Sequence, residues 1–282
     1  LQATISVYKK NQLHFNKCTT ANLWSIGIIE YYEFLDGIFN TAIPADYSLI
    51  IGDKSINNLN NGIPYKSTSN YVKGLLTDNN SGEVYRGKLR YRGDCPYHWL
   101  FDRKSWRFKT KKDNLFDGKR KINFIIPKMN EIINDHLSNE FAKLLGLLAP
   151  DSSIVTLNIN NTYDGTKYLV EQLDENFLRN NKKMPGDLYS GDNVINSVYL
   201  GVDKYLLSSS SLWEKFSYNN HYEKENLKPL DFFINSINSG NHSLIDLNQF
   251  AKFSTLISLT GTRHVDNVHN WKLLYDNYHE KF

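Results

Sequence analysis

The sequence predicts an α+β fold, in which strands and one helix precede a mainly helical half. Residues 71–111 alternate apolar and polar side chains, which is typical of strands that bury one face. Residues 128–146 carry apolar side chains at helical spacing, with Gly146 as a stop and Pro150 beyond it. Two further strands follow, and after Asp174 we expect helix and loop. This order of elements indicates an α+β protein.

The sequence predicts a helix and several strands before the helix at residues 128–146. An apolar and aromatic stretch, Leu23–Phe39, predicts a buried helix, and Tyr47–Asp53 predicts a short buried strand. A hairpin is predicted around the turn residues DNNSG, at 78–82. A third strand is expected over Arg103–Lys111, where Lys104, Trp106 and Phe108 share one face and Ser105, Arg107 and Lys109 the other. Two strands joined by the turn NNTYDG come after the helix.

Composition narrows the class of protein. The chain has 282 residues, of which 40% are hydrophobic, so it can bury a substantial core. Its net charge of +3 gives no whole-chain signal for nucleic acid or another polyanion. No apolar run reaches the roughly 18 residues of a membrane span. The abundance of Asn, Lys, Ile and Tyr suggests a bacterial source, and the initial Leu suggests that an upstream segment is missing.

The tripeptide Arg92-Gly93-Asp94 raises three alternatives. The first interpretation is an adhesion signal, and the second is a metal or thiol site around Cys95 and His98. The third is the end of a longer motif. Cys18 and Cys95 are far apart and lack a CxxC pattern, so we expect free thiols or packing residues. The longer motif is the interpretation that its surroundings favour.

Several segments, in this order, resemble the spore-coat CotH kinase family. GEVYRGKLRYRG is similar to the family's hairpin and Arg-x-Arg-Gly motif, and FDRKSWRFK to its lysine-bearing strand. The run from INDHLSNEF to YLVEQL resembles its helix and its strand ending in Glu-Gln, and TRHVDNVHNW its Asp-containing segment. Asp94 stands where the family has Asn, CPYHW replaces small residues, and Arg103 replaces a lysine.

The resemblance implies an atypical, two-lobed protein-kinase-like fold. Its parts would be an N-terminal helical extension (1–46), an antiparallel-sheet lobe (47–173) and a mainly helical lobe (174–282). The implied activity is transfer of the γ-phosphate of ATP, with Mg²⁺ or Mn²⁺, to Ser or Thr of a protein. A non-catalytic assembly protein of a spore coat or envelope, and a kinase of a glycan or small molecule, are the alternatives. The compartment is not identified: spore coat, envelope and secretion are all open.

The resemblance also implies roles for residues of the first lobe. Lys104 is the candidate for the strand lysine on the phosphates, with Lys109 as the alternative and Arg90 and Arg92 as further phosphate contacts. Glu140, in the middle of the predicted helix, would pair with that lysine. Without the resemblance, these residues would be an exposed basic strand edge and a solvated helix face.

Glu171 and Leu173 end the last strand of that lobe, where backbone groups would bind adenine. In the second lobe, Asp266 would accept or orient the proton of the acceptor hydroxyl and Asn270 would bind metal. Ordinary kinases separate those two roles by five positions, and here the separation is four. The glycine-rich loop GxGxxG and the P-loop are both absent, and His264 and His269 are expected to be structural rather than zinc ligands.

The family has a metal-binding Asp-x-Asp segment after the strand that matches WKLLYDNYHEKF. The sequence ends at Phe282, before that segment. We therefore expect either that the natural chain continues with it or that the protein is a pseudokinase.

Overall fold

The computed structural model describes residues 44–63, 70–93, 98–99, 101–126, 131–184, 186–191, 205–217, 227–261 and 270–282. It divides into two compact units. The first contains Leu1–Asn139 and Pro150–Gln172, and the second contains Glu140–Ala149 and Leu173–Phe282. The predicted helix at Leu23–Phe39, both cysteines, Asp94 and Asp266 lie outside the described residues. The domain boundaries expected from the sequence stay a prediction.

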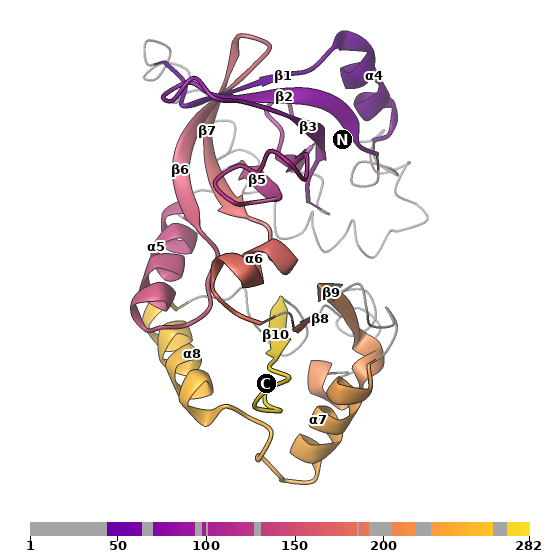
Figure 1. The fold of residues 1–282 in the computed structure, drawn as a ribbon, viewed down its shortest axis with the longest axis vertical. Helices are drawn as coiled ribbons and strands as arrows, with labels where there is room; N and C mark the ends of the chain where they lie inside the picture. Colours follow the sequence, from indigo (N-terminus) through magenta and orange to yellow (C-terminus); the bar gives the residue numbers. More distant parts are fainter. Residues whose placement is uncertain are drawn as a thin grey trace. The chain divides into compact units, whose positions relative to one another are not determined.

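The described part of the first unit is built on a closed seven-stranded barrel (Figure 1). Its strands, in the order in which they pair, are β1 (Tyr47–Ile50), β2 (Val72–Asp78), β3 (Val84–Tyr91), β4 (Trp106–Thr110), β5 (Lys121–Ile125), β7 (Thr162–Glu171) and β6 (Ser152–Ile159). All neighbours are antiparallel except β1 and β6, which pair in parallel and close the barrel. Two helices belong to this part of the chain, α4 (Asp53–Asn61) and most of α5 (Glu131–Leu144).

Side-chain hydrogen bonds connect the two strands at both ends of the β1–β6 pair. At one end the Asp46 carboxylate accepts a hydrogen bond from the Thr156 amide at 2.8 Å, and the Asp46 amide donates to Thr156 Oγ1 at 3.0 Å. At the other end the Asn160 side chain accepts from the Ile51 amide and donates to the Ile51 carbonyl, both at 2.8 Å. These partners are about 110 residues apart in sequence. Local sequence patterns do not predict a pairing between residues so far apart.

The predicted two-lobed kinase-like fold, with an antiparallel sheet and a mainly helical second lobe, is therefore wrong. The observed sheet is mixed and closes on itself. The short strand at Tyr47–Ile50 was expected from its sequence, but its parallel partner was not. Several local predictions are confirmed: the β2–β3 hairpin, the strand β4, the helix α5 and the β6–β7 hairpin. Asn160 and Asn161 both have positive φ, as a two-residue hairpin turn requires.

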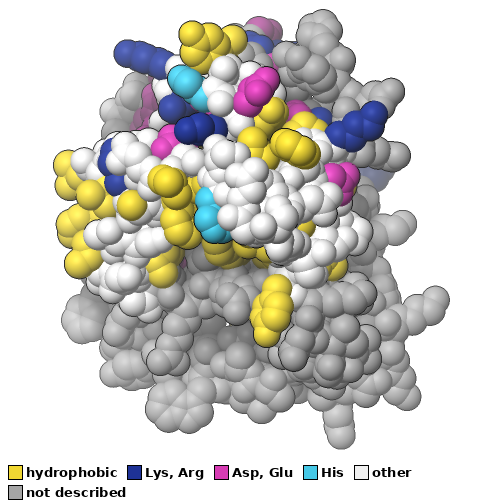
Figure 2. Space-filling model, turned by 90° about the horizontal axis from the view of Figure 1, so that it is seen from below, with side chains coloured by type: hydrophobic (Ala, Val, Ile, Leu, Met, Phe, Trp, Pro, Cys, Tyr) yellow, Lys and Arg dark blue, Asp and Glu magenta, His cyan; other side chains and the backbone are white. Residues whose placement is uncertain are grey.

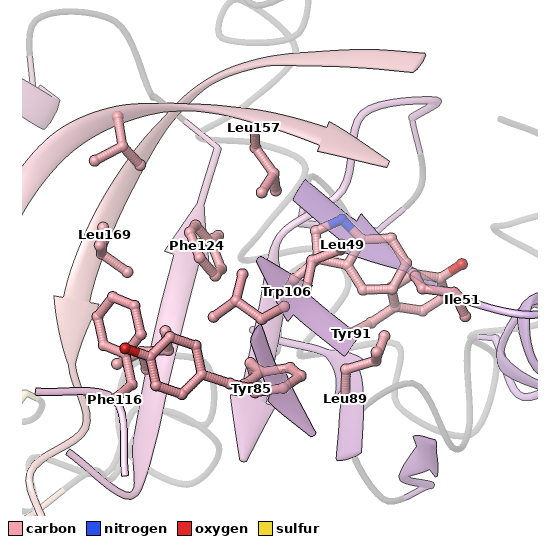
Figure 3. Close-up of a cluster of buried hydrophobic side chains, with 14 of the residues drawn as sticks. Leu49, Ile51, Tyr85, Leu89, Tyr91, Trp106, Phe116, Phe124, Leu157 and Leu169 are labelled. Carbon is pink, nitrogen blue, oxygen red and sulfur yellow. The ribbon is translucent and has the colours of Figure 1, made fainter. Parts of the chain in front are cut away.

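The inward-facing residues of the barrel form one apolar core (Figure 3). Its members include Leu49, Ile51, Leu76, Tyr85, Leu89, Tyr91, Trp106, Phe108, Phe116, Ile122, Phe124, Leu157 and Leu169. Aromatic rings meet edge to face there, with ring centroids 5.8 Å apart for Tyr47 and Phe124 and 5.2 Å apart for Tyr85 and Phe116. Such pairs add about 0.5–1.5 kcal/mol to their burial. The core holds the strands in one register.

The second unit contains a three-stranded antiparallel sheet, of which the sequence predicted only the strand that begins with WKLLY. It is formed by β10 (Trp271–Tyr275), β8 (Asp187–Gly191) and β9 (Trp213–Ser217), in that order. The other elements are α6 (Glu175–Asn180), the short 3₁₀ turns η3 (Leu206–Ser208) and η4 (Ser210–Leu212), α7 (Lys228–Asn238) and α8 (Leu247–Thr260). All five residues of β8 are buried, so the strand lacks the alternation that marks a half-exposed one. This is why the sequence predicted helix and loop after Asp174.

Helix α8 leaves large apolar side chains on the surface. Leu247, Phe250 and Leu259 are exposed, whereas Leu256 packs with Ala142 and Ala149. Figure 2 shows yellow apolar side chains on the face seen from below, between polar and charged ones. Among the described residues, no helix has the length and apolar character needed to cross a membrane.

Candidate functional site

The outward face of β2–β5 is basic. Leu76, Leu89, Phe108 and Phe124 point into the core, so their neighbours along each strand point outward. The outward residues of these four strands are Lys73, Leu75, Thr77, Val84, Arg86, Lys88, Arg90, Arg107, Lys109, Lys121, Asn123 and Ile125. Seven of them are Lys or Arg, and none is Asp or Glu. We call this surface the basic face.

The register places these cations directly opposite one another. Lys73 pairs with Lys88, Lys88 with Lys109, and Lys109 with Lys121, which makes a lysine row across four adjacent strands. In the neighbouring row Arg90 lies opposite Arg107. Like charges opposite each other destabilise a sheet by roughly 0.2–1 kcal/mol per pair. An arrangement with this cost and no carboxylate on the same face is suited to binding an anion.

Tyr71 lies between two of the cations. The guanidinium carbon of Arg90 is 5.2 Å from the centroid of its ring, and Lys109 Nζ is 5.9 Å from the same centroid. Arg90 Nη1 donates to the Tyr91 carbonyl at 3.1 Å, and Arg90 Nε is buried without a hydrogen-bond partner in the described part of the chain. This unused donor lies at the end of the basic face where Arg90 is opposite Arg107.

Arg107 is held in place by an amide network. Its Nε donates to Asn123 Oδ1 at 2.7 Å, and Asn123 Nδ2 reaches the Val170 carbonyl and Gln172 Oε1, each at 3.3 Å. Burial, together with the nearby charges of Arg90 and Arg92, lowers the pKa of Arg107 to about 10. The guanidinium is still charged at neutral pH. A bound anion would relieve this repulsion and raise the pKa again.

Helix α5 forms hydrogen bonds with β6 and β7, beside the basic face. Asn139 Nδ2 donates to the Tyr168 hydroxyl at 2.6 Å, and His136 Nδ1 lies 3.0 Å from Ser152 Oγ. Burial raises the pKa of Tyr168 to about 12, so its hydroxyl stays neutral at neutral pH. Tyr168 is on the outward side of β7, in the same direction as Val170 and Asn123. It extends the face with a neutral polar group.

The resulting site can bind a phosphorylated ligand. Guanidinium groups bind phosphate oxygens through paired N–H donors, and lysines add point charges.

Comparison with family models matches residues 89–282 to the CotH kinase protein family. The chain belongs to this family. No curated protein matches the chain.

Membership of the CotH kinase family makes the chain kinase-like, and four of the matched cations lie on the basic face. Arg90, Arg107, Lys109 and Lys121 all fall within the matched residues. Lys73, Arg86 and Lys88 come before the matched region. The basic face therefore combines residues of the matched region with residues that precede it in the sequence.

The structure accounts for the glycine of the Arg-x-Arg-Gly motif. Gly93 has a φ of 96°, and a Cβ there would lie 1.8 Å from Cδ2 of the His98 ring. His98 is buried, and its Nδ1 lies 2.9 Å from Ser105 Oγ. Trp99 Nε1 donates to the Gly93 carbonyl at 3.2 Å. His98 therefore has a structural role, and Arg92, whose amide donates to the Ser105 carbonyl, belongs to the same corner.

Lys104 and Glu140 each have a local partner. Lys104 Nζ donates to the Phe101 carbonyl at 2.6 Å and lies 5.7 Å from the centroid of the Tyr91 ring. The Glu140 carboxylate forms an ion pair with Lys143 at 2.9 Å, one turn further along α5. The pairing of Glu140 with Lys104 or Lys109 stays a prediction. Lys109, the alternative strand lysine, is the one that lies on the basic face.

The residues expected to bind adenine take part in packing and in the sheet. Glu171 is buried and lies opposite Ile122, a member of the barrel core. Its amide donates to the Asp151 carbonyl at 2.9 Å, and the Gln172 amide to the Lys121 carbonyl at 3.0 Å. Leu173 packs against the apolar cluster of α6 and β8 in the second unit. A role for this segment in binding adenine stays a prediction.

The expected catalytic segment is described only at its end. Asp266 lies outside the described residues, and Asn270 is exposed, with a φ of 65°, directly before β10. Within the described ranges, no three or more His, Cys, Asp or Glu side chains come together in a group able to hold a metal ion.

Sequence reasoning missed most of the basic face. Arg107 and Lys109 were correctly placed on one strand face, but Lys73, Lys88 and Lys121 were not singled out, nor was Tyr71. The signal was present as basic residues at every second position, in VYRGKLRY and WRFKT. Only the register shows that these positions from four strands form one surface.

Proposed function

We propose that this chain is an ATP-dependent kinase that transfers the γ-phosphate of ATP to Ser or Thr of a protein. The family gives the kinase-like class. The observation that carries the proposal is the half-buried group of Arg90, Arg107 and Lys109 around Tyr71. These three cations would bind the triphosphate, because the outward residues of β2–β5 include no carboxylate and Arg90 Nε has no hydrogen-bond partner among the described residues.

The reaction needs positive charge where negative charge develops. The acceptor hydroxyl oxygen attacks the γ-phosphorus, and the bond from the bridging oxygen to that phosphorus breaks. ADP leaves with the electron pair, and the hydroxyl proton passes to the carboxylate assigned to Asp266. Arg90, Arg107 and Lys109 would hold the phosphate oxygens and stabilise the charge that spreads over them. Lys109 takes the strand-lysine role in this proposal, because it lies on the same outward face as Arg90 and Arg107, whereas Lys104 donates to the Phe101 carbonyl.

Mg²⁺ or Mn²⁺ belongs to the proposal through the family resemblance. A divalent cation, when bound, neutralises charge on the phosphates. Asn270 is the described candidate for one oxygen ligand, and it lies at the start of β10. Metal dependence is tested by measuring ATP affinity with and without a chelator.

ATP binding should distinguish the cations of the basic face from other surface lysines. We expect Arg90→Gln and Lys109→Gln each to weaken ATP binding by about 10- to 100-fold, since a hydrogen bond to a charged group contributes roughly 1.5–3 kcal/mol. Lys54→Gln on α4 is the matched control, because Lys54 is exposed in the same unit. Calorimetric titration with ATP gives the affinities. Wild-type affinity in both basic-face variants would refute the phosphate assignment.

Lys104→Gln separates the two lysine assignments. We expect it to leave ATP affinity within about threefold of wild type, whereas Lys109→Gln lowers it by about tenfold or more. The reverse result would return the phosphate role to Lys104.

Replacing Asp266 tests catalysis apart from binding. Asp266→Asn keeps the size of the side chain and removes most of its basicity, so transfer of labelled phosphate should fall by about 10²- to 10⁴-fold. ATP affinity should change little, because the phosphate contacts proposed here come from other residues. Equal transfer by Asp266→Asn and wild type would remove Asp266 from the mechanism. If the wild-type protein binds no ATP, the kinase proposal fails.

A further inference from the structure

The basic face carries more positive charge than the proposed triphosphate site uses. Arg90, Lys109 and Arg107 are assigned to ATP. Lys73, Arg86 and Lys88 have no part in that assignment. Lys73, Arg86 and Lys88 are exposed, and none of the three forms an ion pair with another described residue. Their charges are available to a second anionic group.

The spacing of these three residues fits an extended chain. Lys73 and Lys88 are direct partners on adjacent strands, which lie about 4.8 Å apart. Arg86 is two residues from Lys88 on the same side of β3, about 6.8 Å along the strand. Side chains on one side of an extended peptide repeat at that same interval. Acidic residues at alternate positions of a peptide could therefore meet Lys88 and Arg86 in succession.

This surface is less suited to a nucleic acid. Proteins that bind single strands stack bases on exposed aromatic rings. The outward residues of β2 and β3 include no aromatic side chain, and Tyr71, directly before β2, is flanked by Arg90 and Lys109. The net charge of the whole chain is only +3, so attraction is local to this face.

We propose that Lys73, Arg86 and Lys88 form a docking surface for an acidic acceptor peptide, with Asp or Glu residues close to the Ser or Thr that receives the phosphate. Lys88 lies directly opposite Lys109 of the triphosphate site, so a peptide bound here lies next to the transferred group. This inference rests on the proposed kinase function for its catalytic meaning. The docking itself is a binding property and is measured without catalysis.

The experiment uses three fluorescein-labelled peptides with a central Ser flanked by Glu, by Gln or by Lys. Fluorescence anisotropy at low ionic strength measures their binding to the full chain. We expect the Glu peptide to bind about tenfold more tightly than the Gln peptide, because two or three exposed charge pairs each contribute roughly 0.2–1 kcal/mol. Added salt should reduce this advantage. Equal binding of the Glu and Gln peptides would overturn the proposal.

Charge reversal with a matched control locates the surface. Lys73→Glu/Lys88→Glu should abolish the preference for the Glu peptide and favour the Lys peptide. Lys54→Glu/Lys112→Glu changes the net charge equally at exposed lysines elsewhere in the same unit, and it should leave the preference intact. If both double variants lose the preference alike, attraction is general and the docking surface is refuted. A single-stranded oligonucleotide that binds more tightly than the Glu peptide, and is lost in the first variant only, would also overturn it.

ATP titrations on the same proteins separate the two proposals. If the wild type binds the Glu peptide as expected but binds no ATP, the docking surface stands and the kinase function fails. If ATP binds and displaces the peptide competitively, the lysines belong to the nucleotide site and the docking proposal fails. With active enzyme, Lys73→Glu/Lys88→Glu should raise the KM for the Glu peptide by about tenfold and leave kcat unchanged.

Discussion

The two faces of the barrel sheet differ in how their cations are paired. Inward, Lys167 is fully buried, but its ammonium pairs with Asp164 at 2.9 Å and donates to the Lys104 carbonyl at 3.3 Å. Outward, Lys73 and Lys88 lie opposite each other and have no counter-charge on the basic face. The inward cation is compensated because burial makes an unpaired charge costly. The outward cations are tolerated because water screens them, and they remain available for a ligand.

The inward face should be the more sensitive to truncation. Phe124 is fully buried and contacts Tyr47 edge to face. We expect Phe124→Ala to lower the free energy of unfolding by about 3–5 kcal/mol, from lost burial and the cavity left behind. Urea denaturation followed by circular dichroism measures it. A loss below about 1 kcal/mol would contradict the core described here.

Replacing the buried Lys167 should lower the free energy of unfolding almost as much as Phe124→Ala does. Lys167→Met leaves the Asp164 carboxylate without its partner, so we expect stability to fall by about 3 kcal/mol. Asp164→Asn in the same chain should recover part of the loss, because the remaining charge is then gone. If the double variant is no more stable than Lys167→Met, the pair is not the source of the effect.

The inward packing of Tyr47 should appear at alkaline pH. Burial raises its pKa from 10.0 to about 12, with Asp78 as the next contribution. A group whose pKa is raised in the folded state contributes stability that is complete below pH 10 and is lost as the pH rises towards 12. Tyr47→Phe should therefore show a shallower loss of stability than wild type over that range. Parallel curves for the two proteins would show that the folded state does not protect this phenol.

The smallest expected effect is a gain in stability, where the preceding substitutions in the core cause a loss. Lys88→Gln removes a cation that lies between Lys73 and Lys109, so we expect stability to rise by about 0.2–1 kcal/mol at low salt. The gain should vanish in high salt, because the repulsion is screened. Urea midpoints at both salt concentrations measure it. A loss of stability at low salt would mean that Lys88 has a structural role in the sheet.

Local sequence patterns predicted many elements of the first unit. Alternation marked β2, β3 and β4, turn residues marked both hairpins, and helical spacing with Gly146 marked α5. The same patterns missed β8, because a strand buried along its whole length shows no alternation. For the candidate site, Arg90, Arg92 and Lys109 could be singled out through the family motif, and Arg107 could be placed on the same strand face as Lys109.

The sequence by itself determined which residues alternate along each strand, the family to which the chain belongs and the glycine that the turn beside His98 requires. The tertiary structure decided that β1 pairs in parallel with β6, so that the predicted antiparallel sheet is a closed mixed barrel. It also decided the register that aligns Lys73, Lys88, Lys109 and Lys121. Strand pairing depends on contacts between residues far apart in the chain, and a shift of one residue would turn each of these side chains to the other face.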